Sequence, residues 1–320
     1  KEDGSVIFWG DPVAGGDPVA GDVSSPWGDC GRQDVALLYN LLRKGVKQIY
    51  STGWAFAALK EDGSVVAWGN VLYGGDCRTV NDQLNQGVKQ IYVSRKAFAA
   101  LKDDGTVVTW GLTENGFNKR EIQKNIQEMY STGSSFVALK TDGSETIWAY
   151  HPTRHFSANP RRLLGGVKRI YTTAFAFAAL KYDGSVQTCG KSAYGGDISR
   201  VRVQLREGVK EIFSTKSAFA ALKHDGSVTS WGNFAASDHC GPESDAVLFN
   251  HSSLRGGVKH IYSNFHAFAA IKYDGSVVTW GCPHKGGDSS AVQKQLCDVQ
   301  HIYSTLEAFA CLLYTSDAAD

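Results

Sequence analysis

The 320-residue sequence predicts an all-β fold, a seven-bladed β-propeller with three- to four-stranded blades and short helical or irregular linkers between them. Three observations support this prediction. A motif of the form Ala-Phe-Ala-Ala-Leu-Lys-x-Asp-Gly-Ser-Val-x-x-Trp-Gly recurs, for example at 55–69, 97–111 and 267–281. Its copies follow at intervals of roughly 40 residues, a period typical of solenoids and propellers. Each copy is rich in residues that favour β-strands.

Each repeat contains three short segments that we expect to be strands. In one repeat they are 46–52, 55–60 and 64–68. The second and third are joined by Lys-x-Asp-Gly-Ser, and Asp-Gly is typical of a two-residue hairpin turn in which both central residues have positive φ. The glycine and the paired valines disfavour a helix here.

The segment after each Trp-Gly has a different pattern. In 286–296 an aspartate and two serines suit a helix N-cap, and Val292 and Leu296 stand four residues apart. The same spacing recurs in three further pairs, Val80 with Leu84, Ile122 with Ile126, and Val201 with Leu205. We expect a helix of one or two turns docked by two apolar side chains; a fourth, outer strand is the alternative.

The second and third strands are apolar on both faces, so each sheet needs a neighbour on each side. A closed ring of seven sheets supplies these neighbours. A tryptophan in the third strand is expected to fill the space between blades. Six copies have it, at Trp9, Trp68, Trp110, Trp148, Trp231 and Trp280. Cys189 replaces it once, which predicts a looser blade there.

We expect one propeller domain over residues 1–310. Its terminal segments would share a blade, with 5–9 as the third strand and 299–310 as the first two. Residues 311–320 leave the repeat pattern and resemble a tail translated from a sequencing adapter, so they are excluded from the predicted fold. A divergent last strand is the alternative.

The string Ile-Tyr-Ser-Thr-x-x-Ala-Phe-Ala-Ala-Leu-Lys-x-Asp-Gly-Ser-Val-x-x-Trp-Gly, followed by Gly-Gly-Asp, resembles the repeat of the regulator of chromosome condensation family. The short period is similar to that of the β-lactamase-inhibitor protein in the same superfamily. This resemblance covers residues 1–310 and implies a seven-bladed propeller. Alanines such as Ala55 stand where that family usually has histidine, and Gly-Gly-Asp replaces Gly-Gln-Leu-Gly. The resemblance therefore implies the family's fold rather than its activity.

Composition limits the partners to be expected. The net charge is +1, so bulk electrostatics does not favour nucleic acid. No apolar run approaches the roughly 20 residues of a membrane span, so no membrane partner is expected. The seven cysteines are an odd number without Cys-x-x-Cys, which indicates free thiols and a reducing, intracellular compartment. We expect a monomer.

No pattern indicates catalysis, a cofactor or a metal. Gly190-Lys191-Ser192 resembles the end of a phosphate-binding loop, but Ser185 stands where that loop requires glycine. His151 and His155 are four residues apart without a third ligand nearby. Nothing in the sequence places a nucleophile with a base. We therefore expect a protein that is not an enzyme.

The repeats differ most at two residues between the first and second strands. Because strands alternate in direction, these tips share one face with the ends of the third strands, and the Asp-Gly turns share the other. Several tip residues are aromatic, apolar or basic, the usual anchors of protein interfaces. The predicted partner-binding residues are Trp54, Arg95, Lys96, Phe175, Lys216, Phe265, His266 and Leu306.

The functional prediction is therefore a non-catalytic protein-binding propeller, an interaction scaffold for an unidentified protein. Two alternatives stay open. The chain could be the targeting domain of a larger regulatory enzyme or exchange factor. It could also inhibit a hydrolase in the manner of the β-lactamase-inhibitor protein, which the aromatic tips fit and the unpaired cysteines do not.

Overall fold

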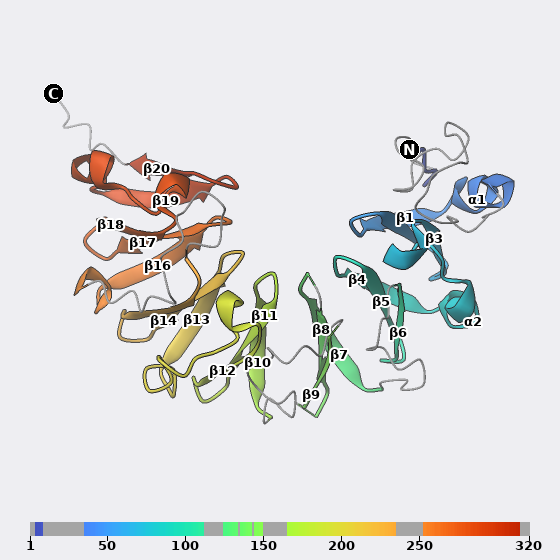
Figure 1. The fold of residues 1–320 in the computed structure, drawn as a ribbon, viewed down its shortest axis with the longest axis horizontal. Coiled ribbons are helices and arrows are strands. Elements are labelled where there is room, and N and C mark those ends of the chain that lie inside the picture. The colour runs from blue at the N-terminus through green and yellow to red at the C-terminus, as the bar shows by residue number, and fades with distance from the viewer. Residues whose placement is uncertain are drawn as a thin grey trace. The chain divides into compact units, whose positions relative to one another are not determined.

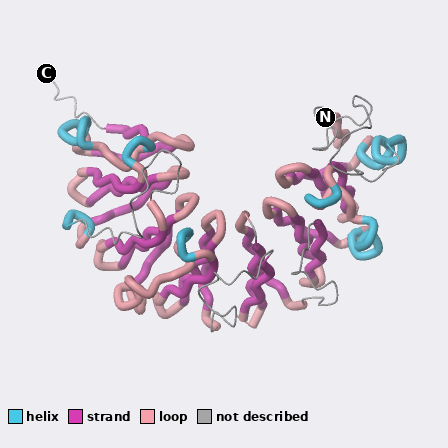
Figure 2. The backbone as a smooth tube through the Cα atoms, in the orientation of Figure 1, coloured by secondary structure: helices cyan, strands magenta, loops and turns pink. Residues whose placement is uncertain are grey.

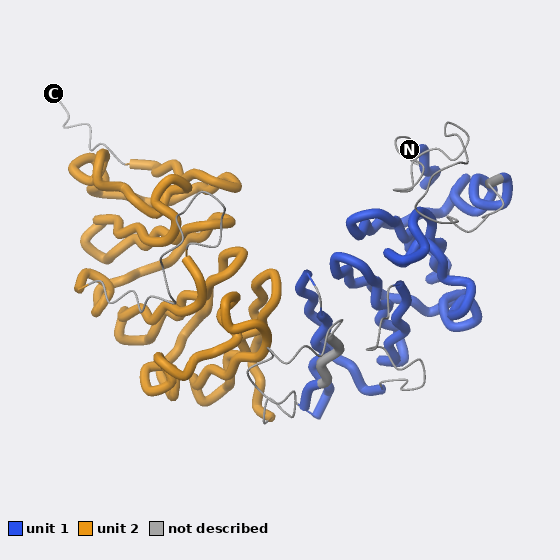
Figure 3. The backbone as a smooth tube through the Cα atoms, viewed as in Figure 1, with its two compact units in different colours: residues 1–152 blue, residues 153–320 orange. Residues whose placement is uncertain are grey.

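A computed structural model describes residues 4–8, 35–111, 124–149 apart from 134 and 143, 165–234 and 252–313. The chain has two compact units, Lys1–Pro152 and Thr153–Asp320 (Figure 3). Strands dominate both units, with short helices between them (Figures 1 and 2). In the described residues the strands form seven small antiparallel sheets, six of three strands and one of two.

Unit 1 contains three sheets whose strands are neighbours in chain order. They are β1 (Val46–Ser51), β2 (Ala55–Lys60) and β3 (Val65–Gly69); β4 (Val88–Val93), β5 (Ala97–Lys102) and β6 (Val107–Gly111); and β7 (Ile126–Ser131), β8 (Ser135–Lys140) and β9 (Glu145–Ala149). The helices are α1 (Val35–Leu42), α2 (Asn81–Leu84), and the 3₁₀ turns η2 (Val71–Tyr73) and η3 (Arg78–Val80).

Unit 2 contains the other four sheets. They are β10 (Val167–Thr172), β11 (Ala176–Lys181) and β12 (Val186–Gly190); β13 (Val209–Ser214), β14 (Ala218–Lys223) and β15 (Val228–Gly232); β16 (Val258–Ser263), β17 (Ala267–Lys272) and β18 (Val277–Gly281); and the pair β19 (Val299–Ser304) and β20 (Phe309–Leu313). Four 3₁₀ turns lie between them, η4 (Ser192–Tyr194), η5 (Ser252–Leu254), η6 (Pro283–Lys285) and η7 (Ser290–Gln295).

The predicted all-β class is confirmed, with one small antiparallel sheet per repeat. The predicted strands agree with β1, β2 and β3 to within one residue at each end. The described sheets have no fourth strand, so the linkers are the short helices and turns of the first interpretation. Closure of the sheets into one ring, and one domain over 1–310, stay predictions.

The predicted helix of one or two turns forms at α2 and η7, whereas 201–205 folds as turns. The apolar contacts of these linkers are largely as expected. Leu84, Val201 and Leu205 are buried in cores between adjacent sheets. Val292 is 45% exposed, so only Leu296 of that pair packs inward. The prediction that Ile126 belongs to a linker helix was wrong, because Ile126 begins β7 in the position that Val88 has in β4. Ile122, its predicted partner, lies outside the described residues.

The Asp-Gly turn differs from the predicted type. Lys60 N–H donates to the Ser64 carbonyl (2.9 Å), which leaves three residues in the loop, and Gly63 N–H donates to the Lys60 carbonyl (3.0 Å). Gly63 has a φ of +76°, whereas Asp62 is not among the described residues with positive φ. The loop is a type I turn followed by a left-handed glycine, so the predicted two-residue turn was wrong.

Asp62 shapes this turn through its carboxylate. Its Oδ1 accepts hydrogen bonds from Ser64 N–H (2.9 Å) and Ser64 Oγ (2.6 Å). These bonds, the side-chain bond first, lower the pKa of Asp62 below its ordinary value. The same arrangement recurs at Asp104, Asp142, Asp225 and Asp274. It explains why the turn keeps aspartate followed by glycine and serine or threonine.

The turn glycine also approaches the next sheet. The Gly63 carbonyl accepts a hydrogen bond from Val88 N–H (3.0 Å), the first residue of β4. A Cβ on Gly63 would lie 2.8 Å from Gly87 N, closer than packed atoms come. The same bond to the next sheet recurs at Gly105, Gly184, Gly226 and Gly275. Glycine is therefore required here for its φ and for this close approach.

The tryptophan that recurs in the third strands is buried, and Trp110, Trp231 and Trp280 pack in cores between adjacent sheets, as predicted. Trp68, Trp110, Trp231 and Trp280 are all at most 4% exposed. The Trp110 Nε1–H donates to the Gly74 carbonyl at 3.0 Å, and Trp231 Nε1–H makes the equivalent bond to Gly195. Trp9 and the Trp148 side chain lie outside the described residues. Cys189 is buried, and the looser blade around it stays a prediction.

The N-terminal segment 4–8 contacts the first sheet as a third strand contacts the sheet that follows it. Val46 N–H donates to the Gly4 carbonyl (3.0 Å), the counterpart of the bond from Val88 to Gly63. The Phe8 ring stacks on Tyr39 and lies 5.8 Å from the Trp68 ring. These contacts support the predicted role of 5–9 as a third strand; its place in a shared blade stays a prediction.

Two boundary and cysteine predictions need correction. β20 continues to Leu313, where that residue pairs with Val299, so the fold extends past the predicted limit at 310 and matches the divergent-strand alternative up to 313. Cys282 is disulfide-bonded, whereas Cys77, Cys189, Cys297 and Cys311 are free thiols. The prediction of free thiols alone was therefore wrong.

None of the described helices has the length and apolar character of a membrane span.

Candidate protein-binding surface

The tips between the first and second strands are joined to one another through their backbones. In unit 1, Gly53 N–H donates to the Arg95 carbonyl (3.2 Å) and Arg95 N–H donates to the Gly133 carbonyl (3.1 Å). In unit 2 the equivalent bonds form a series. Ala174 N–H donates to the Lys216 carbonyl (2.9 Å), Lys216 N–H to the Phe265 carbonyl (2.9 Å) and Phe265 N–H to the Leu306 carbonyl (3.2 Å). The first tip residue of each sheet thus takes part in a main-chain hydrogen bond with a neighbouring tip.

The residue before each tip is serine, threonine or asparagine. At Thr52, Thr173 and Asn264 this residue holds the tip to the linker turn that follows. The Thr173 hydroxyl donates to the Tyr194 carbonyl (2.9 Å) and accepts from Ala176 N–H (3.1 Å). Thr52 makes the equivalent bond to the Tyr73 carbonyl at 3.0 Å. The tips and the linker turns η2, η4 and η6 therefore form one surface in each unit. We call these the tip surfaces.

The tip surface of unit 1 combines two aromatic rings with basic side chains. Trp54 is 44% exposed and its ring lies 6.2 Å from that of Tyr73 in η2. The Lys96 ammonium lies 5.6 Å from the Tyr73 ring centroid, on the side of the next sheet. Arg95 is exposed beside them. Three predicted site residues, Trp54, Arg95 and Lys96, are thus brought together around Tyr73.

The tip surface of unit 2 has two such groups. Phe175 packs edge-on against Tyr194 (4.7 Å between ring centroids), and the Lys191 ammonium lies 4.5 Å from the Phe175 ring. The Lys216 ammonium lies 5.3 Å from the Phe265 ring. Phe265 and Leu306 are 40% and 63% exposed. Phe175 is only half-buried, so it contributes less open surface than predicted.

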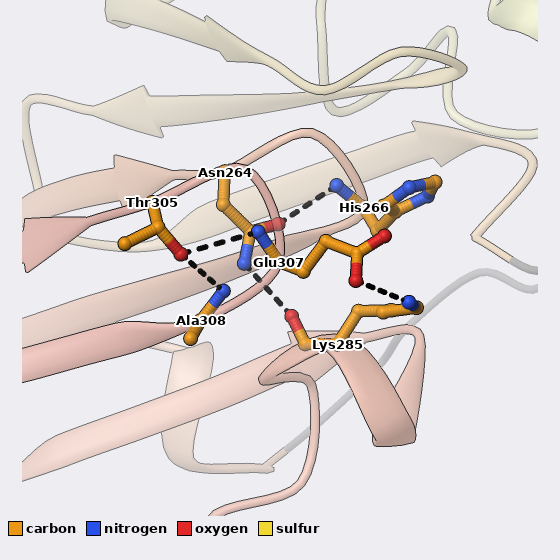
Figure 4. A network of polar contacts seen from close by, with 6 residues as sticks. All are labelled: Asn264, His266, Lys285, Thr305, Glu307 and Ala308. Carbon is orange, nitrogen blue, oxygen red and sulfur yellow. Dashed lines mark hydrogen bonds and ion pairs between the residues drawn. The ribbon is translucent and has the colours of Figure 1, made fainter.

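A polar network ties the last two tips of unit 2 to η6 (Figure 4). Asn264 Oδ1 accepts from His266 N–H (2.7 Å), and its Nδ2 donates to the Lys285 carbonyl (2.8 Å). The Lys285 ammonium forms an ion pair with the Glu307 carboxylate. Burial lowers the pKa of His266; the Glu307 carboxylate opposes this shift, and Lys216 and Lys285 add to it. His266 is therefore predominantly neutral at pH 7.

Sequence reasoning missed the linker residues of these surfaces. The missed residues belong to the segments that follow the third strands, and they contact the tips: Tyr73, Lys191, Tyr194 and Lys285. A signal was present in the sequence, because those segments begin on the same face as the tips. The predicted residues themselves are all at the tips, three in unit 1 and five in unit 2.

Other chemistry has little support in the described residues. No group of three or more His, Cys, Asp or Glu side chains in the described ranges could hold a metal. Lys191 of the apparent phosphate-loop sequence covers the Phe175 ring. His151 and His155 lie outside the described residues.

Comparisons with known proteins gave similar folds only. No family model matches the chain, and no curated protein matches it. Solved structures similar to it include Prp20p of Saccharomyces cerevisiae, at 18% identity and a TM-score of 0.43, covering 74% of this chain and 72% of that one. Human WBSCR16 has 16% identity and a TM-score of 0.41, covering 87% and 86%. The Cps50 (Swd1) β-propeller domain of Myceliophteria thermophila has 12% identity and a TM-score of 0.31, covering 75% and 84%.

Another similar structure is that of Kap60 bound to yeast RCC1 (Prp20), at 17% identity and a TM-score of 0.43, covering 75% of this chain and 70% of that one. The similar structures thus include RCC1, the protein whose family repeat this sequence resembles.

Proposed function

We propose that this chain is a non-catalytic protein-binding scaffold and that its partner contacts the tip surfaces. The observation that carries the proposal is the exposure of large apolar side chains at tips that are joined to neighbouring segments through main-chain hydrogen bonds. Trp54, Phe265 and Leu306 are between 40% and 63% exposed. Phe265 and Leu306 are first tip residues joined to their neighbours by main-chain bonds, and the Trp54 carbonyl accepts from Asn70 N–H (2.9 Å), so the backbone bonds at these positions do not require large apolar side chains.

The chemistry of the tips supports a protein partner. Aromatic side chains are enriched at protein interfaces and among the residues that contribute most to binding, and a lysine beside such a ring adds N–H donors for a partner's acceptors. The tip surfaces provide such pairs at Lys96 with Tyr73, Lys191 with Phe175 and Lys216 with Phe265. Cation–π contact restrains both side chains before binding, which reduces the entropy that ordering them would cost.

The opposite ends of the same sheets provide a matched control. Tyr182 and Tyr273 follow the second strand directly and are 77% and 73% exposed. Tyr273 lies in the sheet that carries Phe265, and Tyr182 in the sheet that carries Phe175. A comparison of tip and turn residues therefore separates a specific surface from general exposure of aromatic groups.

The test is photo-crosslinking with a benzophenone amino acid placed at Trp54 or Phe265, or at Tyr182 or Tyr273 as controls. Crosslinked proteins from an extract of the source cells are identified by mass spectrometry. We expect the tip positions to give the same discrete partner and the turn positions to give none. The identified partner, once purified, should lose binding to Trp54→Ser and Phe265→Ser while the thermal midpoint stays unchanged. Equal crosslinking from both ends would contradict the proposal.

A further inference from the structure

The tip surface of unit 2 has an apolar centre with cations beside it. Phe265 and Leu306 are neighbours, because the Phe265 N–H donates to the Leu306 carbonyl at 3.2 Å. Lys216 comes next in the series, and its ammonium lies over the Phe265 ring at 5.3 Å. Three consecutive sheets thus present lysine, phenylalanine and leucine in order.

The charges of this surface are unequal. Its cations are Lys191, Lys216 and Lys285, and its carboxylate is that of Glu307. Lys285 is paired with Glu307. Among the described residues, no carboxylate lies within ion-pair distance of Lys191 or Lys216, which instead cover aromatic rings. A cation over a ring keeps N–H groups that can donate to a further acceptor.

We infer that the partner segment bound by unit 2 is acidic and carries a bulky apolar side chain. This inference rests on the proposed function and specifies its ligand. Carboxylates of the segment would meet the Lys216 and Lys191 ammonium groups, and the apolar side chain would cover Phe265 and Leu306. Both requirements rest on the charge and exposure of the surface: among the described residues the two ammonium groups have no carboxylate within ion-pair distance, and Phe265 and Leu306 are exposed.

A nucleic acid would also satisfy the cations, but it fits the surface less well. Polyanion binding depends on many cations along a track, whereas this surface offers two lysines that lack a carboxylate partner in the described part of the chain. Leu306 has an exposed aliphatic side chain, which has no counterpart in a phosphate backbone and does not stack as an aromatic ring does. An acidic protein segment uses both the lysines and the leucine.

The experiment is a selection of phage-displayed random peptides on the immobilised full chain. It is repeated on Lys191→Ala/Lys216→Ala, on Phe265→Ser/Leu306→Ser, and on Lys210→Ala/Lys259→Ala. The last variant removes two exposed lysines from β13 and β16, near the opposite ends of those strands. Enriched peptides are resynthesised with a fluorescent label, and their affinities are measured at low and high salt, and with an oligothymidylate competitor.

We expect peptides selected on the wild-type chain to be enriched in both Asp or Glu and large apolar residues. Loss of Lys191 and Lys216 should weaken their binding roughly five- to tenfold, the size expected for two exposed ion pairs, and loss of Lys210 and Lys259 by less than about twofold. Binding should also weaken as salt is raised. Phe265→Ser/Leu306→Ser should abolish it.

The possible failures are distinguishable. Peptides that depend on Phe265 and Leu306 but lack acidic residues, or ignore the two lysines, would overturn this inference and leave the proposed function intact. Displacement by oligothymidylate at equimolar concentration would overturn it in favour of a nucleic acid. If no selected peptide depends on the tips, both the inference and the proposed function are wrong.

Discussion

The replacement Gly63→Ala tests whether the close contact between consecutive sheets contributes to stability. Gly63 has a φ of +76°, and the added Cβ would lie 2.8 Å from Gly87 N and 3.3 Å from Val88 N. The left-handed conformation costs alanine about 1–2 kcal/mol. Movement of the 87–88 backbone would also weaken the bond from Val88 N–H to the Gly63 carbonyl, worth about 0.5–1.5 kcal/mol. The expected destabilisation is therefore about 1.5–3.5 kcal/mol.

Gly166 provides the matched control. Its φ is +72°, but a Cβ there would meet nothing within 4 Å. Gly166→Ala should therefore cost only the conformational part, about 1–2 kcal/mol. Gly166→Asn should cost less, because Asn125 and Asp298 have φ values of 62° and 55° at the equivalent position before β7 and β19.

The assay is urea unfolding of the full chain followed by tryptophan fluorescence, since several tryptophans are buried between strands and linkers. The quantity compared is the change in free energy of unfolding for Gly63→Ala and Gly166→Ala. If both cost the same, the reasoning is refuted, because the contact with Gly87 would then contribute nothing. If Gly63→Asn is as stable as the wild-type chain, the contact with Gly87 contributes nothing, because asparagine tolerates the positive φ but adds the same Cβ.

Three further predictions concern buried or hydrogen-bonded side chains. Trp231→Phe should lower the free energy of unfolding by about 1–2 kcal/mol more than Trp280→Phe, since the Trp231 indole N–H donates to the Gly195 carbonyl and the buried Trp280 indole N–H has no hydrogen-bond partner among the described residues. Hydrogen bonds lower the pKa of Asp225, so its contribution is present above the ordinary value of 3.8 and lost as pH falls below it; Asp225→Asn should flatten the loss of stability on acidification in urea titrations. Burial raises the pKa of the Cys189 thiol from 9.0 to about 11, so iodoacetamide at slightly alkaline pH should label Cys297 in the folded chain and Cys189 only in urea. The first argument fails if the two tryptophan variants lose the same free energy of unfolding, and the second if Asp225→Asn and the wild-type chain lose stability equally on acidification. The third fails if Cys189 and Cys297 are labelled equally in the folded chain.

The strands could be predicted because their pattern repeats within the chain. Residues 55–60 form β2 as expected, since apolar side chains on both faces and a following Asp-Gly leave few alternatives. The turn type was missed because Asp-Gly occurs in two kinds of hairpin, and only the pairing of Lys60 with Ser64 separates them. Ile126 was misplaced because a spacing of four fits a helix even when one member begins a strand.

The site was predictable in its tips and not in its linkers. Trp54 and Phe265 stand out in sequence because their counterparts in other repeats are different residues. Tyr73 and Tyr194 do not, since their contacts depend on how η2 and η4 fold back beside the tips. The hydrogen bonds between tips use main-chain atoms, so they do not restrict which side chains occur there. The variable tip residues therefore gave no sign in the sequence that these bonds exist.

The main-chain series through the tips has an evolutionary consequence. Arg95, Lys216 and Phe265 each donate through N–H and accept through C=O, so nineteen of the twenty amino acids can be exchanged there without losing a bond. Proline alone lacks the donor, and none of the seven tips contains it. Mutation can thus vary the recognition chemistry while the scaffold is inherited unchanged. An engineer could randomise the same positions, with proline omitted, to obtain new binding specificities.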